Sequence, residues 1–223
     1  MRIEDKIKKF DIPKEKEKID KARLKYKDFI NLYPFRDYPE KIDILTSEQI
    51  YNPNKNDSQY FFYWIEHGLI PLGHLTIGSA KVWENAKNNS GTLKELLKIA
   101  VDDSASFAKK VDSYWGDIKG FGGDKHIAKK IISCYYPKEI IPIFKTKDLK
   151  NFAEAADMDY RGVAINKYGK EYDSLSPGEK FELLNGLFLS YKNQSNEFKN
   201  WDNALFACFL CSVLPASESR GIK

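Results

Sequence analysis

The 223-residue sequence has few of the residues on which metal and redox sites depend. It contains only three cysteines and three histidines. Zinc sites need Cys or His ligands at short, regular spacings, and His67, His74 and His126 share no such spacing. We therefore expect no metal. An odd number of cysteines in apolar surroundings suits a reducing compartment.

Long hydrophobic runs are also missing. No stretch of 18 apolar residues occurs, so we expect no membrane span. The first ten residues, MRIEDKIKKF, are too charged for a secretory signal. Together with the cysteine usage, these features predict a cytoplasmic protein.

Two families of catalytic motif are absent as well. The sequence has neither a GxSxG nucleophile turn nor a GxxxxGK[ST] phosphate loop. Its one glycine-rich stretch, GFGGDK at 120–125 with Lys119 before it, lacks the preceding apolar strand of a nucleotide site. We expect no hydrolase triad and no cofactor.

What is present is one helical pattern after another. Apolar residues recur at helical spacing, and S/T-x-x-E/Q capping boxes begin at Thr46, Thr92 and Ser176. Pro142 argues against a central strand at 139–144. The pattern predicts an all-α fold with helices at 13–33, 58–67, 93–102, 104–115, 125–136, 146–157, 179–193 and 200–214, and a short hairpin or loop near 161–172. We divide the chain into an N-terminal helical arm, 1–45, and an all-α domain, 46–223.

Charge is unevenly distributed along this chain. The net charge is +4, but residues 105–150 hold ten lysines, no arginine and five acidic residues, a net +5, so the rest sums to −1. A local basic surface is typical of a polyanion partner. A solvated lysine-rich surface without a partner is the alternative.

The basic segment contains the glycine-rich turn IKGFGGDKHIAKKI, residues 118–131. Glycines leave backbone N–H groups accessible, and the helix that follows directs its N-terminal partial positive charge to the same point. This combination favours a phosphate-diester site, although a plain turn between two helices would read similarly. Gly122 is where we expect the backbone conformation that only glycine tolerates well. The expected phosphate-binding residues are Lys119, Gly120, Gly122, Gly123, Lys125, His126 and Lys129.

This turn resembles the helix-hairpin-helix motif of DNA-binding proteins, here over residues 105–136. The following IAKKIISCYYPKEIIPIFKTK is similar to the segment after the hairpin in base-excision glycosylases. The resemblance implies a catalytic Asp where this chain has Lys145, and it makes Lys125 the Schiff-base amine of a lyase. A glycosylase or lyase acting on damaged or modified bases is therefore the alternative function, and Lys145 argues against it.

A second resemblance covers YFFYWIEHGLIPLGHLTIGSAKVWENA. It is similar to N-terminal regions of McrB-type modification-dependent restriction proteins, with Trp64, Ile65, Glu66, Gly78, Ser79 and Lys81 at the shared positions. The resemblance implies a DNA-reading module of a restriction or defence system, partnered by a motor or nuclease that this chain does not contain.

The expectation is thus a module that binds double-stranded DNA, plain or base-modified. Trp115, just before the turn, is the candidate for stacking on a base. A protein-interaction module with an acidic protein partner is the third alternative.

Overall fold

The computed structural model describes residues 3–53, 60–75, 77 and 79–214. Within these residues it is built of helices with no β-strand, so the predicted all-α class is confirmed. The elements are η1 (Ile3–Lys9), α1 (Ile12–Leu32), η2 (Pro39–Ile42), α2 (Ser47–Ile50), α3 (Phe61–Tyr63), η3 (Trp64–Gly68), η4 (Ile70–Leu72), α4 (Lys81–Asn88), α5 (Ser90–Val101), α6 (Phe107–Asp112), η5 (Trp115–Asp117), α7 (His126–Tyr135), α8 (Thr146–Ala155), α9 (Tyr160–Tyr168), η6 (Tyr172–Ser174), α10 (Pro177–Gln194) and α11 (Asn203–Val213).

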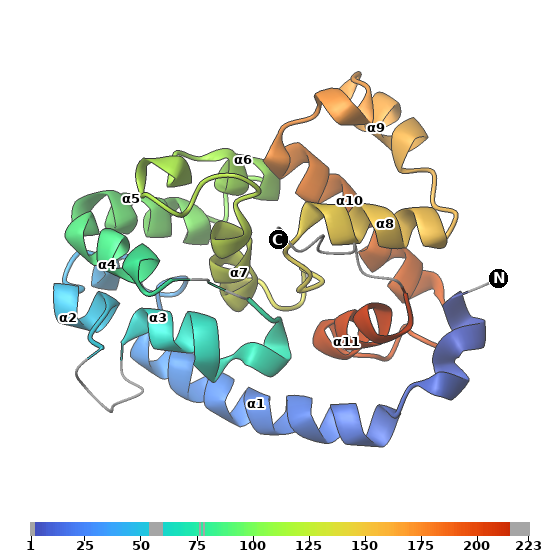
Figure 1. Cartoon of the computed structure of the whole chain (residues 1–223), viewed down its shortest axis with the longest axis horizontal. Helices are drawn as coiled ribbons and strands as arrows, with labels where there is room; N and C mark the ends of the chain where they lie inside the picture. Colours follow the sequence, from blue (N-terminus) through green and yellow to red (C-terminus); the bar gives the residue numbers. More distant parts are fainter. Residues whose placement is uncertain (1–2, 54–59, 76, 78, 215–223) are drawn as a thin grey trace, which may run out of the picture.

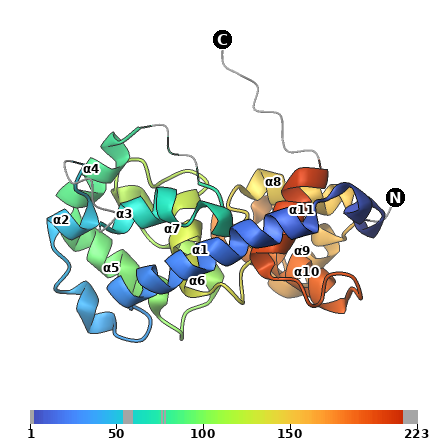
Figure 2. The ribbon, with the colours of Figure 1, turned by 90° about the horizontal axis from the view of Figure 1, so that it is seen from below.

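The helices form two groups, and α1 runs along both of them. Figure 1 shows α2 to α7 gathered on one side, α8 to α11 on the other, and α1 beneath. The same arrangement is seen from below in Figure 2. One hydrophobic core includes Ile19 and Phe29 of α1 together with residues of both groups. The segment expected to be an arm is thus packed against the rest, while its treatment as a separate domain stays a prediction.

The central helix is α7, not the C-terminal helix. Every residue from Ile127 to Tyr135 is buried. The sequence favours α11 for this role because its residues 204–214 are almost all apolar, yet Cys211 is exposed and Cys208 is partly so. The sequence does not show that α7 is central, because α7 carries Lys129 and Lys130, which normally indicate an exposed helix. Both lysines are buried, and their ammonium groups donate to oxygen atoms of other segments.

Capping explains where several helices begin. The capping boxes at Thr46 and Ser176 form as expected, each with reciprocal hydrogen bonds to the third helical residue. The box expected at Thr92 does not begin a helix, because α5 already starts at Ser90.

The hairpin or loop expected near 161–172 is wrong for most of its length. Residues Tyr160–Tyr168 form α9. The Asp159 carboxylate accepts a hydrogen bond from the Gly162 N–H, and Gly169 ends the helix in the left-handed region, φ 66°. An aspartate at the start and a glycine at the end are ordinary helix signals that the expectation of a hairpin or loop overlooked.

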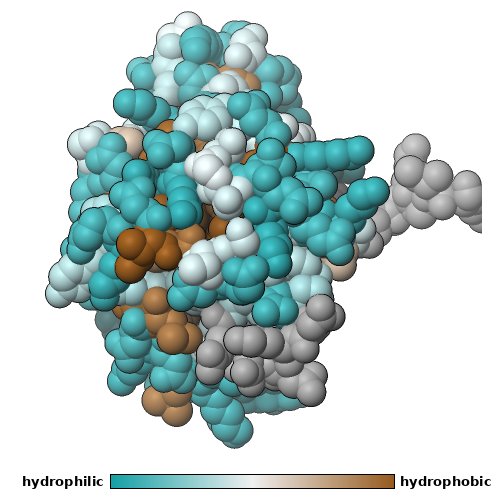
Figure 3. Space-filling view, turned by 90° about the vertical axis from the view of Figure 1, so that its left-hand side faces the viewer, coloured by the Kyte–Doolittle hydropathy of each residue, from teal (hydrophilic) through white to brown (hydrophobic). Residues whose placement is uncertain are grey.

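Two features concern the surface. No helix among the described residues is long and apolar enough to cross a membrane. Seen from the end where α2, α4 and α5 lie, the surface is mostly hydrophilic, with a few apolar residues near the middle (Figure 3).

Candidate nucleic-acid interface

The glycine turn joins two unequal helical pieces. α6 ends at Asp112, and the short η5 at Trp115–Asp117 then leads into the turn. α7 begins at His126 with no side-chain cap. A continuous first helix up to the turn, as in the predicted hairpin unit, is therefore not formed, although the second helix starts where expected.

The glycines do not share one role. Gly120 and Gly123 adopt left-handed conformations, with φ of 101° and 60°, and Lys125 does so with φ of 57°. Gly122 does not, so the expectation placed on it is wrong. A β-carbon at Gly120 would lie 2.8 Å from Cγ2 of Val82 on α4, which makes Gly120 the position that glycine alone can fill.

Backbone donors collect at this turn. The N–H groups of residues 122–124 and 126–128 have no acceptor in the described part of the chain, but Ile127 and Ala128 are buried, so the donors open to a ligand are those of residues 122–124 and 126. The last of these is the first N–H group of α7, where a helix leaves its N–H groups unpaired. They meet the positive end of the helix dipole, so the turn can bind an anionic oxygen through the backbone alone.

Free cations surround these donors. Lys119 and Lys145 are exposed and Lys125 is partly exposed. None of the three lies within 4.0 Å of a carboxylate among the described residues. The Lys125 Nζ folds back over the turn, 3.3 Å from where a β-carbon of Gly116 would stand.

His126 stands half-buried at the first position of α7. Burial lowers the pKa of its imidazole, and the positive charges of Lys129 and Lys145 lower this pKa further, against the opposing effect of Asp124. The side chain is therefore neutral at pH 7 and can donate a hydrogen bond without adding a charge.

Lys129 is not part of this surface, contrary to expectation. It is fully buried. Its Nζ donates to Asp124 Oδ1 at 2.7 Å, to Thr146 Oγ1 at 2.7 Å and to the Phe144 carbonyl at 3.2 Å. All three hydrogens of the ammonium are used within the chain, so Lys129 has none to offer a phosphate.

Trp115 is also unavailable to a base. Its side chain is fully buried, and its indole N–H donates to the Lys110 carbonyl at 2.8 Å. Its ring stacks on Phe121, with 6.3 Å between centroids. The proposed base-stacking role is wrong because the residue before the turn points into the core.

Asp124 is the important residue that sequence reasoning missed. Besides pairing with Lys129, its carboxylate accepts the Thr146 N–H at 2.8 Å and the Thr146 hydroxyl at 2.5 Å. It thereby caps α8 and ties the glycine turn to the start of that helix. Lys145, the residue before Thr146, is held beside the turn as a result.

The glycosylase pattern can be compared at the same place. Lys145 is the exposed N-cap residue of α8, and the half-buried Asp148 follows on that helix. The Asp124 carboxylate, bonded to Thr146 next to Lys145, is already engaged by Lys129 and Thr146.

The segment that resembles McrB-type proteins packs directly against the turn. Asn85 Nδ2 of α4 donates to the Lys119 carbonyl at 3.0 Å, and Val82 contacts Gly120. Glu66 accepts the Trp83 indole N–H at 2.5 Å, which ties η3 to α4. Lys81 is exposed at the start of α4; Gly78 lies outside the described residues.

Comparisons with known proteins add no assignment: family models, curated proteins and solved structures all gave no match. Among the described residues no three metal-binding side chains come together.

Proposed function

We propose that this protein binds double-stranded DNA, with a backbone phosphate held at the N-terminus of α7. The observation that carries the proposal is the set of N–H groups at residues 122–124 and 126, which are at least partly exposed and lack an acceptor in the described chain. A phosphate oxygen satisfies such donors and is favoured by the helix dipole.

The cations support a polyanion rather than a single ion. Lys119, Lys125 and Lys145 flank the turn, and Lys81 lies at the start of the neighbouring α4. These four ammonium groups have no carboxylate partner among the described residues, so they can contact successive phosphates of a backbone, and each contact releases counterions. Gly122 and Gly123 leave the backbone open to the approach, whereas Gly120 packs against Val82.

The recognition role in a restriction or defence system is the finer part of the proposal. It is supported by the packing of the segment that resembles McrB-type proteins against the glycine turn, through Asn85 and Val82. In this role the chain positions the duplex, plain or base-modified, and a motor or nuclease partner acts on it. Phosphate contacts fix position without reading sequence.

A salt titration tests the DNA proposal. Binding of a labelled duplex, followed by fluorescence anisotropy between about 50 and 200 mM salt, should give a slope of log K against log salt of roughly −4 for four to five phosphates. Lys119→Met should reduce the magnitude of that slope by about 1. The matched control is Lys27→Met, because Lys27 is exposed on α1 and has no ion pair among the described residues, and α1 lies away from the turn (Figure 1).

Three outcomes would contradict the proposal. The first is an absence of binding at about 50 mM salt, and the second is a flat salt response. The third is equal loss of binding in Lys119→Met and Lys27→Met. Competition by polyglutamate as strong as by unlabelled duplex would instead indicate an acidic protein partner.

A further inference from the structure

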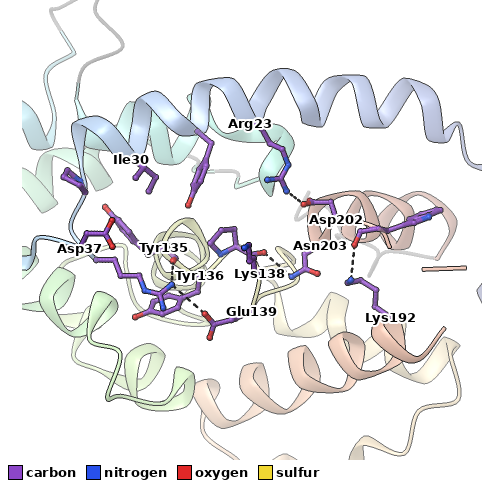
Figure 4. A pocket seen from close by; sticks show the side chains of 15 residues that line it. Arg23, Ile30, Asp37, Tyr135, Tyr136, Lys138, Glu139, Lys192, Asp202 and Asn203 are labelled. Atoms are coloured by element: carbon purple, nitrogen blue, oxygen red, sulfur yellow. Dashed lines mark hydrogen bonds and ion pairs between the residues drawn. The ribbon is translucent and has the colours of Figure 1, made fainter. Parts of the chain in front are cut away.

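A second concave site lies at the other end of α7. It is a cavity of about 710 Å³ bounded by α1, by the loop after α7 and by the segment between α10 and α11. Figure 4 shows its side chains converging from these elements. A helix of ten residues is about 15 Å long, so α7 separates this cavity from the glycine turn.

Lys192 supplies an unpaired positive charge at this cavity. It reaches up from α10 and is only 5% exposed (Figure 4). Its Nζ donates to the Trp201 carbonyl at 3.0 Å, and no carboxylate among the described residues lies within 4.0 Å of it. Burial lowers the pKa of this amine. A buried ammonium with two unused hydrogens is costly unless an anion joins it.

The two arginines around the cavity are both paired with carboxylates. Arg23 is paired with Asp202. Arg36 donates to Asp103 at 3.0 Å and lies 3.7 Å from Glu139.

Two remaining charged groups have no ion pair in the described chain. Lys138 is exposed at the rim, and Asp37 lies at the opposite end of the cavity from Lys192 (Figure 4). An anion that enters beside Lys192 therefore meets cations and backbone oxygen but no free carboxylate.

Aromatic rings provide the rest of the lining. Tyr26 and Trp201 are both partly exposed in the cavity wall. The Tyr26 hydroxyl donates to the Cys134 carbonyl at 2.8 Å, which fixes the ring. Planar ligands stack on a ring such as that of Tyr26. The ring of Trp201 already packs against Phe10, Phe198 and Phe209, and the ring of Tyr136 is covered by Arg36 and Lys110, at 4.1 and 3.6 Å.

We propose that this cavity binds a small organic phosphate carrying a planar ring, the chemistry of a nucleoside monophosphate. Lys192 pairs with the phosphate, Lys138 adds charge at the rim, and Tyr26 contacts the ring. The volume lies within the range of small-molecule sites, about 300–1,000 Å³. This site is independent of the DNA proposal, since it shares no residue with the glycine turn.

Calorimetric titration of the full chain tests the site with three probes: adenosine 5′-monophosphate, adenosine and inorganic phosphate. We expect the monophosphate to bind at least about tenfold more tightly than either of the other two. Lys192→Met should reduce monophosphate affinity about tenfold and leave adenosine affinity unchanged, and Lys138→Met should reduce it less. Lys119→Met, at the glycine turn, is the control and should bind the monophosphate like the parent.

Thermal unfolding separates ligand binding from a purely structural role of Lys192. Without ligand, Lys192→Met should be at least as stable as the parent, because an unpaired buried charge is removed. The monophosphate should raise the unfolding temperature of the parent more than that of the variant. Duplex DNA affinity should be the same for both proteins, which keeps this site distinct from the turn.

Several results would overturn the proposal: no monophosphate binding by the parent, equal binding of adenosine and the monophosphate, or parent-like monophosphate affinity in Lys192→Met. If Lys192→Met does not fold, Lys138→Met decides, because its exposed side chain can be changed without disturbing the core. Parent-like monophosphate affinity in that variant then counts against the site.

Discussion

Replacing Lys129 with alanine should unfold the protein at much lower temperature while affecting DNA binding only through folding. The change removes an ammonium that is fully buried and that donates to Asp124, Thr146 and the Phe144 carbonyl. Breaking a buried ion pair costs roughly 3–5 kcal/mol. The Asp124 side chain is 36% exposed and keeps part of its hydration, so we expect about 3 kcal/mol, the low end.

For a chain of this size, about 3 kcal/mol corresponds to a fall in unfolding temperature of roughly 6–12 °C. Circular dichroism on thermal and urea unfolding measures it. Lys125→Ala is the control, since a partly exposed lysine without an ion pair should change stability by no more than about 0.5 kcal/mol. At a temperature where Lys129→Ala is folded, its salt slope for DNA should match that of the parent.

The reasoning would be refuted by the opposite pattern. If Lys129→Ala unfolds like the parent but binds DNA with a salt slope smaller by about 1, then Lys129 contacts phosphate and the burial seen in the structure does not hold in solution. A double-mutant cycle with Asp124→Asn adds a second check, because two residues in direct contact should show a coupling energy of about 0.5–3 kcal/mol.

Three further outcomes are expected. Gly120→Ala should destabilise the protein by more than about 1 kcal/mol in urea unfolding, because its φ of 101° and the nearby Val82 both oppose a β-carbon. Gly186→Ala on α10, where a β-carbon would meet open space, should stabilise the protein by up to about 1 kcal/mol in the same assay. Lys110→Met should be more stable than the parent at pH 7, because burial lowers the pKa of Lys110 to about 8. Between pH 8 and 10.5 the unfolded chain holds a proton on Lys110 that the folded chain has lost, so the stability of the parent rises with pH in that window. The difference in unfolding free energy between Lys110→Met and the parent, measured by urea unfolding, should therefore be smaller at pH 10 than at pH 7. Duplexes carrying damaged or methylated bases should show no strand breaks after alkali on a denaturing gel, and breaks that vanish in Lys125→Ala would establish the lyase instead.

Sequence reasoning located the glycine turn and the start of α7 because the signals are local. A glycine cluster followed by an amphipathic pattern marks a turn and a helix wherever it occurs. Capping boxes predicted α2 and α10 for the same reason. The Asp and Gly that delimit α9 are equally local signals, and the expectation of a hairpin or loop overlooked them.

Burial of Lys129 and Trp115 could not be read from the neighbouring sequence. The oxygen atoms that satisfy Lys129 come from Phe144 and Thr146, on a segment that must first be folded back against α7. A lysine in an amphipathic pattern is ordinarily exposed, so the sequence assigned it to the surface. The cavity at Lys192 was missed for a related reason, since its walls come from three distant segments.

The packing of α1 on α11 also determines the order in which this chain can reach its final structure. The Lys6 ammonium donates to the Val213 carbonyl across 207 residues, and α1 packs on both α11 and the short η4 turn. During synthesis, α1 can pack on η3 and η4 early, but its contacts with α11 form only after α11 has been made. Contacts of such sequence separation slow folding, and until then the part of α1 that α11 covers stays exposed in the nascent chain.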